Sequence, residues 1–171
     1  MCSSDLLLAG HETSVNLLTN TIVCLDQNPE ALEEVEVSPE LIPSLVEEVL
    51  RYLPPVWDIF RLSRMEVELG GQTIPPYQVI LTWLASANRD EAQFPQADRF
   101  DIRREPNHHV AFGHGIHFCL GAPLARLEAK VALPMILQQL PGLRRVPDVP
   151  VKARTGIVFA IRELPVIWDK H

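Results

Sequence analysis

One short segment constrains this chain more than any other: a cysteine enclosed by glycines and aromatic residues directly before a long helical pattern. The segment reads FGHGIHFCLG from Phe112 to Gly121, and its cysteine is Cys119. A cysteine binds metal only as the thiolate, and the start of a helix, with its free backbone N–H groups, favours that anion. Gly113 and Gly115 can adopt positive φ and let the backbone approach a flat ligand closely. The pattern therefore predicts Cys119 as a metal ligand.

Two other interpretations of Cys119 stay open on the residues alone. A lone cysteine is often a small buried hydrophobic residue. Alternatively, His114, His117 and Cys119 could contribute to a zinc site, although structural zinc usually takes its ligands from two short clusters and the chain has no second cysteine pair. The other two cysteines, Cys2 and Cys24, are widely spaced in the sequence. This spacing favours a reducing compartment without disulfides and a packing role for both.

The cysteine segment resembles the haem-binding signature of the cytochrome P-450 family, Phe-Gly-x-Gly-x-His/Arg-x-Cys-x-Gly, and matches it at every fixed position. Such a pattern is far more specific than a lone glycine motif. The resemblance implies haem b (iron-protoporphyrin IX) as the cofactor and Cys119 as its iron ligand. It also implies contacts to the haem from Ala111, Phe112, Gly113, His117 and Gly121.

A second motif, Ala9-Gly10-His11-Glu12-Thr13-Ser14, places an acid and two hydroxyls in an apolar helical pattern. On the residues alone, Thr13 bonds back to the preceding turn and Glu12 faces solvent. The stretch also resembles the oxygen-activating motif of the cytochrome P-450 family, Ala/Gly-Gly-x-Asp/Glu-Thr-Thr/Ser. That resemblance implies that Glu12 and Thr13 deliver protons during catalysis, and that Ala9, Gly10 and Thr13 lie beside the haem.

A third motif is the pair Glu48 and Arg51, whose side chains share one face of a predicted helix because they are three residues apart. An exposed pair of this kind contributes about 0.5 kcal/mol or less. The segment FPQADRF at 94–100 resembles the family segment whose arginine completes a buried Glu-Arg-Arg network. The resemblance implies Arg99 as the third member, although three residues separate Pro95 from Arg99 where the commonest family form has one. The network would hold the loop that presents Cys119.

Haem carries two propionates, which need cations or hydrogen-bond donors at the rim of a binding site. By the same resemblance, Arg61, His109 and His117 align with propionate-binding positions of the family. The segment from Val56 to Phe60 would line the substrate pocket, and Val56 would also contact the haem. On the residues alone, Arg61 could equally be a solvated arginine at the end of a strand.

The hydrophobic periodicity predicts a mainly α fold with small β-sheets, an α+β class. Helical spacing covers 5–26, 29–35, 38–52 and 120–140, with a brief helical turn at 85–89. Short β-branched and aromatic runs around Phe60, at 67–69 and at 79–83 indicate strands, and 143–168 alternates enough for two or three more. A long polar loop reaches Val110. The resemblance implies the C-terminal part of the cytochrome P-450 fold, from the oxygen-binding helix through the Cys-ligand loop and following helix to the terminal strands. Residues 1–171 would be a single partial domain that lacks the N-terminal half.

Charge and hydropathy bound the partners and the compartment. The net charge of -7 argues against nucleic acid as a partner. The short apolar stretch at 6–9 supports neither a signal peptide nor a membrane span, so we expect a cytoplasmic protein.

The resemblance implies a haem-thiolate monooxygenase, an oxidoreductase that inserts one oxygen atom of dioxygen into a small hydrophobic organic substrate. Electrons would come from a separate ferredoxin or flavodoxin-type donor. We expect this donor to dock near Cys119 against a basic group formed by Arg103, Arg104, Arg126 and Lys130. The alternative is a truncated, non-catalytic remnant that binds haem weakly or not at all. A missing N-terminal segment or self-association would cover the apolar surface that such a chain exposes.

Overall fold

A computed structural model describes residues 3–154 and 158–169 of the chain. Its helical elements are α1 (Ser3–Gln27), α2 (Pro29–Val37), η1 (Pro39–Leu41), α3 (Ile42–Tyr52), α4 (Leu84–Ala87), η2 (Gly115–His117) and α5 (Ala122–Gln139). The four long predicted helices are confirmed, and the third begins with the 3-10 turn η1 before α3. Within the described residues, no helix is long and apolar enough to cross a membrane.

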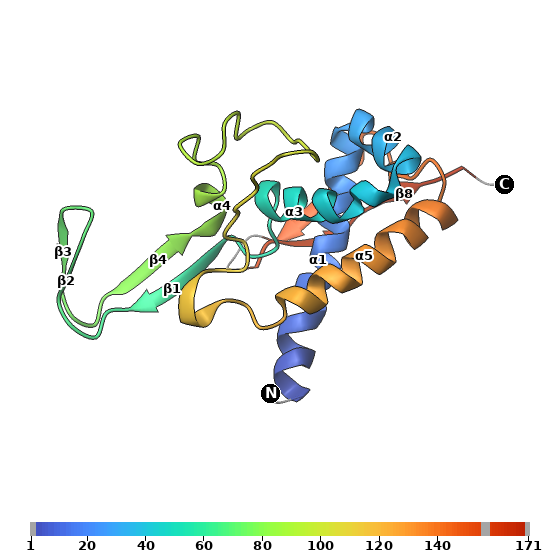
Figure 1. The fold of residues 1–171 in the computed structure, drawn as a ribbon. Helices are drawn as coiled ribbons and strands as arrows, with labels where there is room; N and C mark the ends of the chain where they lie inside the picture. Colours follow the sequence, from blue (N-terminus) through green and yellow to red (C-terminus); the bar gives the residue numbers. More distant parts are fainter. Residues whose placement is uncertain (1–2, 155–157, 170–171) are drawn as a thin grey trace.

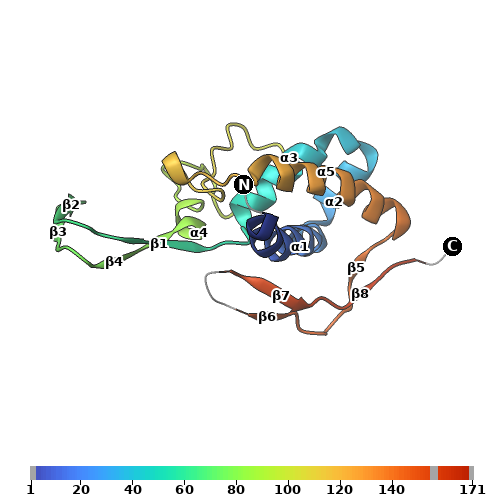
Figure 2. The same ribbon diagram turned by 90° about the horizontal axis from the view of Figure 1, so that it is seen from below.

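Helix α1 is the central element of the fold. Figures 1 and 2 show α3 and α5 on one side of it and the strands of the C-terminal region on the other. The apolar residues of α3 recur at 42, 45, 46, 49 and 50, which is the spacing of one buried helical face. This face joins a core of side chains from α1, α2, α5 and the loop before η2: Leu17, Cys24, Leu25, Ala31, Val35, Phe100, Ile102, Ala129 and Leu133.

The packing role predicted for Cys24 is confirmed. Its side chain is fully buried in this core, and burial raises the pKa of the Cys24 thiol to about 12. Cys2, for which the same role is predicted, lies outside the described residues.

The described strands pair two by two, all antiparallel. Strand β1 (Asp58–Leu62) pairs with β4 (Val79–Trp83), and β2 (Val67–Leu69) pairs with β3 (Gln72–Ile74) between them. Together they form one long hairpin that projects away from the helices (Figure 1). The C-terminal region holds β5 (Arg144–Arg145) paired with β8 (Val166–Ile167), and β6 (Lys152–Arg154) paired with β7 (Ala160–Glu163). The predicted strands are confirmed. Strand β3 was not predicted, and the C-terminal region holds four strands where two or three were expected.

The register of the hairpin divides its side chains between two faces. Phe60 lies opposite Leu81, and Leu62 lies opposite Val79. Residues directly opposite each other in an antiparallel pair share a face, so these four side chains form one surface. All four are exposed. The alternate residues Ile59 and Arg61 belong to the other face, which borders the site described below.

Residues 88–114 form the predicted long loop, with turns but no helix or strand. Phe94, Phe100 and Ile102 are buried and anchor the loop beside α3. The loop ends at η2, which lies within the cysteine segment, and α5 follows directly after that segment. The path of this loop therefore decides where Cys119 lies.

Candidate active site

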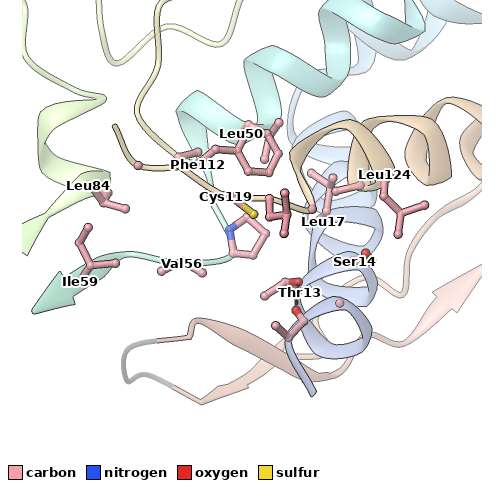
Figure 3. Close-up of a pocket in the computed structure, with 18 of the residues that line it drawn as sticks. Thr13, Ser14, Leu17, Leu50, Val56, Ile59, Leu84, Phe112, Cys119 and Leu124 are labelled. Carbon is pink, nitrogen blue, oxygen red and sulfur yellow. Dashed lines mark hydrogen bonds between the residues drawn. The ribbon is translucent and has the colours of Figure 1, made fainter. Parts of the chain in front are cut away.

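The candidate residues converge on one cavity of about 590 Å³ beside α1, shown in Figure 3. Most of its walls come from α1, the segment from Pro55 to Arg61, the segment from Ala111 to Gly121, and the first turns of α5, and α3 and α4 contribute one residue each. The lining is mainly apolar. It includes all but one of the residues predicted to contact the cofactor: Ala9, Gly10, Thr13, Val56, Arg61, Ala111, Phe112, Gly113, His117, Cys119 and Gly121. The exception is His109.

Cys119 presents its sulfur to this cavity. Figure 3 shows the sulfur directed toward the space between Val56 and α1. The Cys119 backbone N–H donates to the Phe112 carbonyl over 2.9 Å and so closes the loop. Gly113 and Gly115 have φ of 73° and 75°, the left-handed conformation that the sequence predicts for them. The side chain therefore leaves the loop just before α5 begins at Ala122.

Glu48 and Arg51 form a buried pair, as predicted. Neither side chain is exposed to solvent. Arg51 donates from Nε and Nη2 to the two carboxylate oxygens of Glu48, each over 2.8 Å. Its remaining N–H groups reach the carbonyls of Asn88, Ala97 and Arg99 at 2.8 to 3.0 Å. All five donors of the guanidinium are thus used, and three of them hold the long loop to α3.

The prediction that Arg99 supplies the third side chain of this network is wrong. Arg99 is exposed, and only its carbonyl faces α3. Arg104 takes the place instead: its side chain is 9% exposed, its Nε lies 3.3 Å from a Glu48 oxygen, and its Nη1 donates to the Pro95 carbonyl over 2.8 Å. The physical reason is the path of the loop, which turns the Arg99 side chain outward and returns at Arg104.

The Glu48 carboxylate also accepts hydrogen bonds from the backbone N–H of Asp101 (2.8 Å) and from Nδ2 of Asn107 (3.1 Å). Asn107 and Arg104 stand three residues apart in the loop, and both contact this one buried carboxylate. A polar run leading into the cysteine segment is the sequence signal that could have identified them.

His109 lies outside the cavity lining, so the geometry does not support its predicted contact with a propionate. Its side chain is 3% exposed, and its Nε2 lies 3.0 Å from a Glu47 carboxylate oxygen. The backbone N–H of Ala111 donates to Nδ1 over 3.2 Å. Both ring nitrogens are therefore engaged within the protein. Arg61 and His117 are the predicted propionate ligands that do line the cavity.

Glu47 also binds Arg126 of α5, from Nε to Oε1 over 2.6 Å and from Nη2 to Oε2 over 2.8 Å. Burial by itself would raise the pKa of Glu47, but hydrogen bonds from Arg126 and His109 outweigh it and lower the pKa to about 2. The same carboxylate raises the pKa of Arg126. Both charges are therefore permanent at neutral pH.

These contacts revise the basic group expected near Cys119. Arg104 is buried in the Glu48 network, and Arg126 is paired with Glu47. Arg103 is paired with Glu34 of α2. Lys130, the fourth member, is exposed. Three of the four cations are thus neutralised within the protein, and the expectation of a free four-residue basic surface is wrong.

The α1 motif shows the arrangement expected from its residues alone. Thr13 donates its hydroxyl hydrogen to the Ala9 carbonyl over 2.6 Å, four residues back. Glu12 is exposed, and its carboxylate lies 3.4 Å from Arg154 of β6. Ser14 donates to the Glu128 carboxylate of α5 over 2.5 Å. Thr13 nevertheless lines the cavity, so the back-bonded hydroxyl also borders the site.

Several lining residues were missed by the sequence analysis: Ser14, Leu17, Leu50, Pro55, Leu84, Leu120, Leu124, Ala125 and Glu128. Ser14 and Leu120 lie inside segments that the sequence analysis singled out, but no contact was assigned to them. Ile59 also lines the cavity and belongs to the segment predicted to line the substrate pocket. Leu17 could have been found because it follows Thr13 by four residues, on the same helical face. Leu50 and Leu84 carry no local signal, since only the packing of α3 and α4 brings them to the cavity.

The residues present fit a haem. An apolar lining suits a flat hydrophobic ring, an accessible thiol suits an axial ligand, and Arg61 and His117 suit acidic groups at its rim. The zinc alternative finds no support, because no three His, Cys, Asp or Glu residues among the described ones gather as metal ligands.

The sequence matches the family model described as Cytochrome P450 over residues 40–162. Among curated relatives, the mycinamicin IV hydroxylase/epoxidase of Micromonospora griseorubida is 44% identical over 95% of this chain and 42% of its own length. The biotin biosynthesis cytochrome P-450 of Bacillus subtilis is 43% identical over 96% of this chain and 42% of its own length. The chain thus spans about two fifths of the length of the curated relatives it matches.

A solved structure gives the same result for the fold. CYP109E1 from Bacillus megaterium, in complex with testosterone, superposes with a TM-score of 0.92 at 40% sequence identity. The alignment covers 96% of this chain and 46% of that one. The mixed arrangement of helices and small sheets is therefore the one found in part of that structure.

Proposed function

Because this chain belongs to the cytochrome P-450 family, we propose that it forms the thiolate-bearing part of the haem site of a monooxygenase. The observation that carries the proposal is the Cys119 sulfur, which a closed loop directs into a mainly apolar cavity. A haem held by the Cys119 thiolate would supply oxygen activation, since a thiolate ligand donates electron density that favours cleavage of the O–O bond.

The residues of the chain divide the remaining work. Cys119 binds the iron, and Arg61 and His117 bind the propionates. Apolar side chains such as Leu17 and Ile59 exclude water, which strengthens the electrostatic interactions inside the site. Glu48, Arg51 and Arg104 touch neither cavity nor cofactor, and they position the loop. The remaining predicted contacts to haem b come from the other residues of the cavity lining named above.

We assign proton handling to Glu12 and Thr13 on α1. Thr13 lines the cavity, and the exposed Glu12 precedes it, so the pair links the site to solvent. The Thr13 hydroxyl can accept a hydrogen bond through its lone pairs while its own hydrogen is bonded to the Ala9 carbonyl, and it can donate into the cavity once that bond is released.

The substrate class we propose is a small hydrophobic organic molecule. The apolar lining supports it, and so do the relatives, one of which is named for mycinamicin IV and one of which holds testosterone. Electrons would come from a separate ferredoxin or flavodoxin-type donor that docks near the cysteine loop, with the exposed Lys130 of the following helix α5 as a candidate contact. We propose the cytoplasm as the compartment, which suits the free thiols of Cys24 and Cys119.

The remnant hypothesis is not favoured. A relative that is 44% identical over 95% of this chain is named as a hydroxylase/epoxidase. In this chain, Arg104 completes the buried network around Glu48, and the hydrogen bond from the Cys119 N–H to the Phe112 carbonyl closes the cysteine loop.

The test is a spectrum. The protein is reconstituted with haem, reduced and exposed to carbon monoxide, and we expect the strongly red-shifted Soret band of a thiolate-ligated ferrous complex. Cys119→Ala should lose this band while its helix content by circular dichroism stays unchanged. His114→Ala, an exposed change in the same loop, is the matched control and should keep the band. A band that persists in Cys119→Ala would refute the proposal.

A further inference from the structure

A compact charged cluster lies next to the cysteine loop without lining the cavity. It consists of Glu47 from α3, His109 from the long loop and Arg126 from α5. The two Arg126–Glu47 hydrogen bonds are parallel and bidentate, which is the strongest geometry for such a pair. The cluster thus fastens three separate parts of the chain at one point.

This cluster reaches Cys119 through Phe112. The guanidinium carbon of Arg126 lies 4.6 Å from the centroid of the Phe112 ring, within the range of a cation–π contact. The His109 and Phe112 ring centroids are 6.1 Å apart. The Phe112 carbonyl in turn accepts the Cys119 N–H. A continuous series of contacts therefore connects Glu47, Arg126, Phe112 and Cys119 in that order.

The order of these contacts matters for the charges. Arg126 is the cation nearer to the loop, and Glu47 stands behind it. Because Arg126 is held by both Glu47 and the Phe112 ring, its positive charge stays in one place, and partial burial reduces screening by salt.

We propose that Arg126 and Glu47 are opposed positioning residues that set the electrostatic environment of the Cys119 sulfur. Arg126 stabilises negative charge at the sulfur and at the metal bound to it, and Glu47 limits that stabilisation. His109 completes the cluster by donating its Nε2 hydrogen to Glu47. The inference rests on the proposed function, since it assigns these residues a role toward a haem held by Cys119.

The experiment measures the midpoint reduction potential of the haem iron in the reconstituted protein. Reduction adds one negative charge to the site. Arg126→Gln removes the stabilising cation and should lower the potential. Glu47→Gln leaves the cation without its counter-charge and should raise the potential. The double variant should fall between the two single variants. Opposite signs are the required result, because a cluster that only held the loop would shift both variants in the same direction.

Two further variants separate charge from packing. Arg126→Lys keeps the positive charge but loses the bidentate fork, so its potential should stay closer to that of the unsubstituted protein than the potential of Arg126→Gln does. It also keeps the test available should Arg126→Gln fail to fold. Arg144→Gln removes an exposed arginine of β5 paired with Asp169 and should leave the potential unchanged.

The outcomes distinguish the inference from the function on which it rests. If the unsubstituted protein lacks the red-shifted Soret band, both are refuted. If the band is present but the Arg126 and Glu47 variants shift the potential in the same direction, or leave it unchanged, only the inference is overturned.

Discussion

Charged side chains are buried behind the cysteine loop, whereas large apolar side chains are exposed on the β1–β4 hairpin. Glu48 and Arg51 are 0% exposed, while Phe60 is 58% and Val79 is 70% exposed. Both regions depart from the usual distribution, because the loop region buries charged groups and the hairpin exposes apolar ones. The comparison shows that directional bonds within this chain determine the position of the loop, while the exposed hairpin face adds little to the stability of the chain.

The two regions differ in how sharply they respond to change. A buried ion pair is tolerated only when further hydrogen bonds satisfy both partners, and removing one partner leaves an uncompensated charge. An exposed apolar side chain gains little from folding, so its removal costs little. We therefore expect substitutions to have large effects near the loop and small effects on the hairpin face.

The largest effect should come from Arg51→Ala. This change leaves the Glu48 carboxylate buried beside its remaining partners and releases three loop carbonyls. We expect a loss of about 3–5 kcal/mol in the free energy of unfolding, measured by urea titration. The exposed Arg144→Ala serves as the control. A loss below about 1 kcal/mol would break the comparison, because the buried network would then not hold the loop.

Acid should weaken the same region through Glu47. The pKa of Glu47 is about 2 in the folded protein against an ordinary value of 4.5. A lowered folded-state pKa contributes stability that is fully present above pH 4.5 and is lost as the pH falls toward 2. We expect a contribution of less than about 3 kcal/mol, because Glu47 is partly exposed to solvent.

The measurement is the free energy of unfolding of the unsubstituted protein and of Glu47→Gln, from about pH 6, roughly two units above the ordinary pKa of a glutamate, down to about pH 2. The variant should show a shallower loss of stability over this range. Equal slopes in the two proteins would show that Glu47 is not held as a carboxylate by Arg126 and His109.

Arg104 and Arg99 sharpen the comparison within the loop itself. Arg104→Ala removes a nearly buried side chain from Glu48 and from three loop carbonyls, and should cost about 1–3 kcal/mol. Arg99→Ala keeps the carbonyl that binds Arg51 and should change stability by about 0.5 kcal/mol or less. Thermal unfolding of the two variants side by side decides the matter, and the reverse ranking would restore Arg99 as the third member.

The smallest effect should be found on the hairpin. Phe60→Thr replaces an exposed aromatic ring in β1 by a β-branched side chain that also suits a strand, so stability should change by about 0.5 kcal/mol or less. Self-association measured by light scattering should fall, because exposed apolar patches promote it. A loss comparable to that of Arg51→Ala would mean that the hairpin face is as important to stability as the loop.

The sequence analysis succeeded where the signal is local. Helical spacing located α1, α3 and α5, and a ten-residue motif located the cysteine loop with both of its left-handed glycines. Nearly all of the predicted cofactor contacts line one cavity, because those contacts belong to short motifs whose geometry is set within a few residues.

The failures involve residues that a long loop brings together. No spacing rule connects Arg104 to Glu48, or His109 to Glu47, because the intervening segment has no periodic structure. Likewise, ion pairing is invisible in a list of basic residues, so Arg103 and Arg126 were counted as free cations. Tertiary contacts of this kind depend on the path of the backbone rather than on local propensity.

The back-bond from Thr13 to Ala9 has one more consequence. The single hydrogen of this hydroxyl is already bonded to the Ala9 carbonyl, so the oxygen can offer a ligand in the cavity only its lone pairs. A ligand that donates a hydrogen bond can bind to the Thr13 oxygen without any change in α1. A ligand that accepts a hydrogen bond requires the Thr13 side chain to rotate and leave the Ala9 carbonyl without its bond. This wall of the cavity therefore favours hydrogen-bond donors.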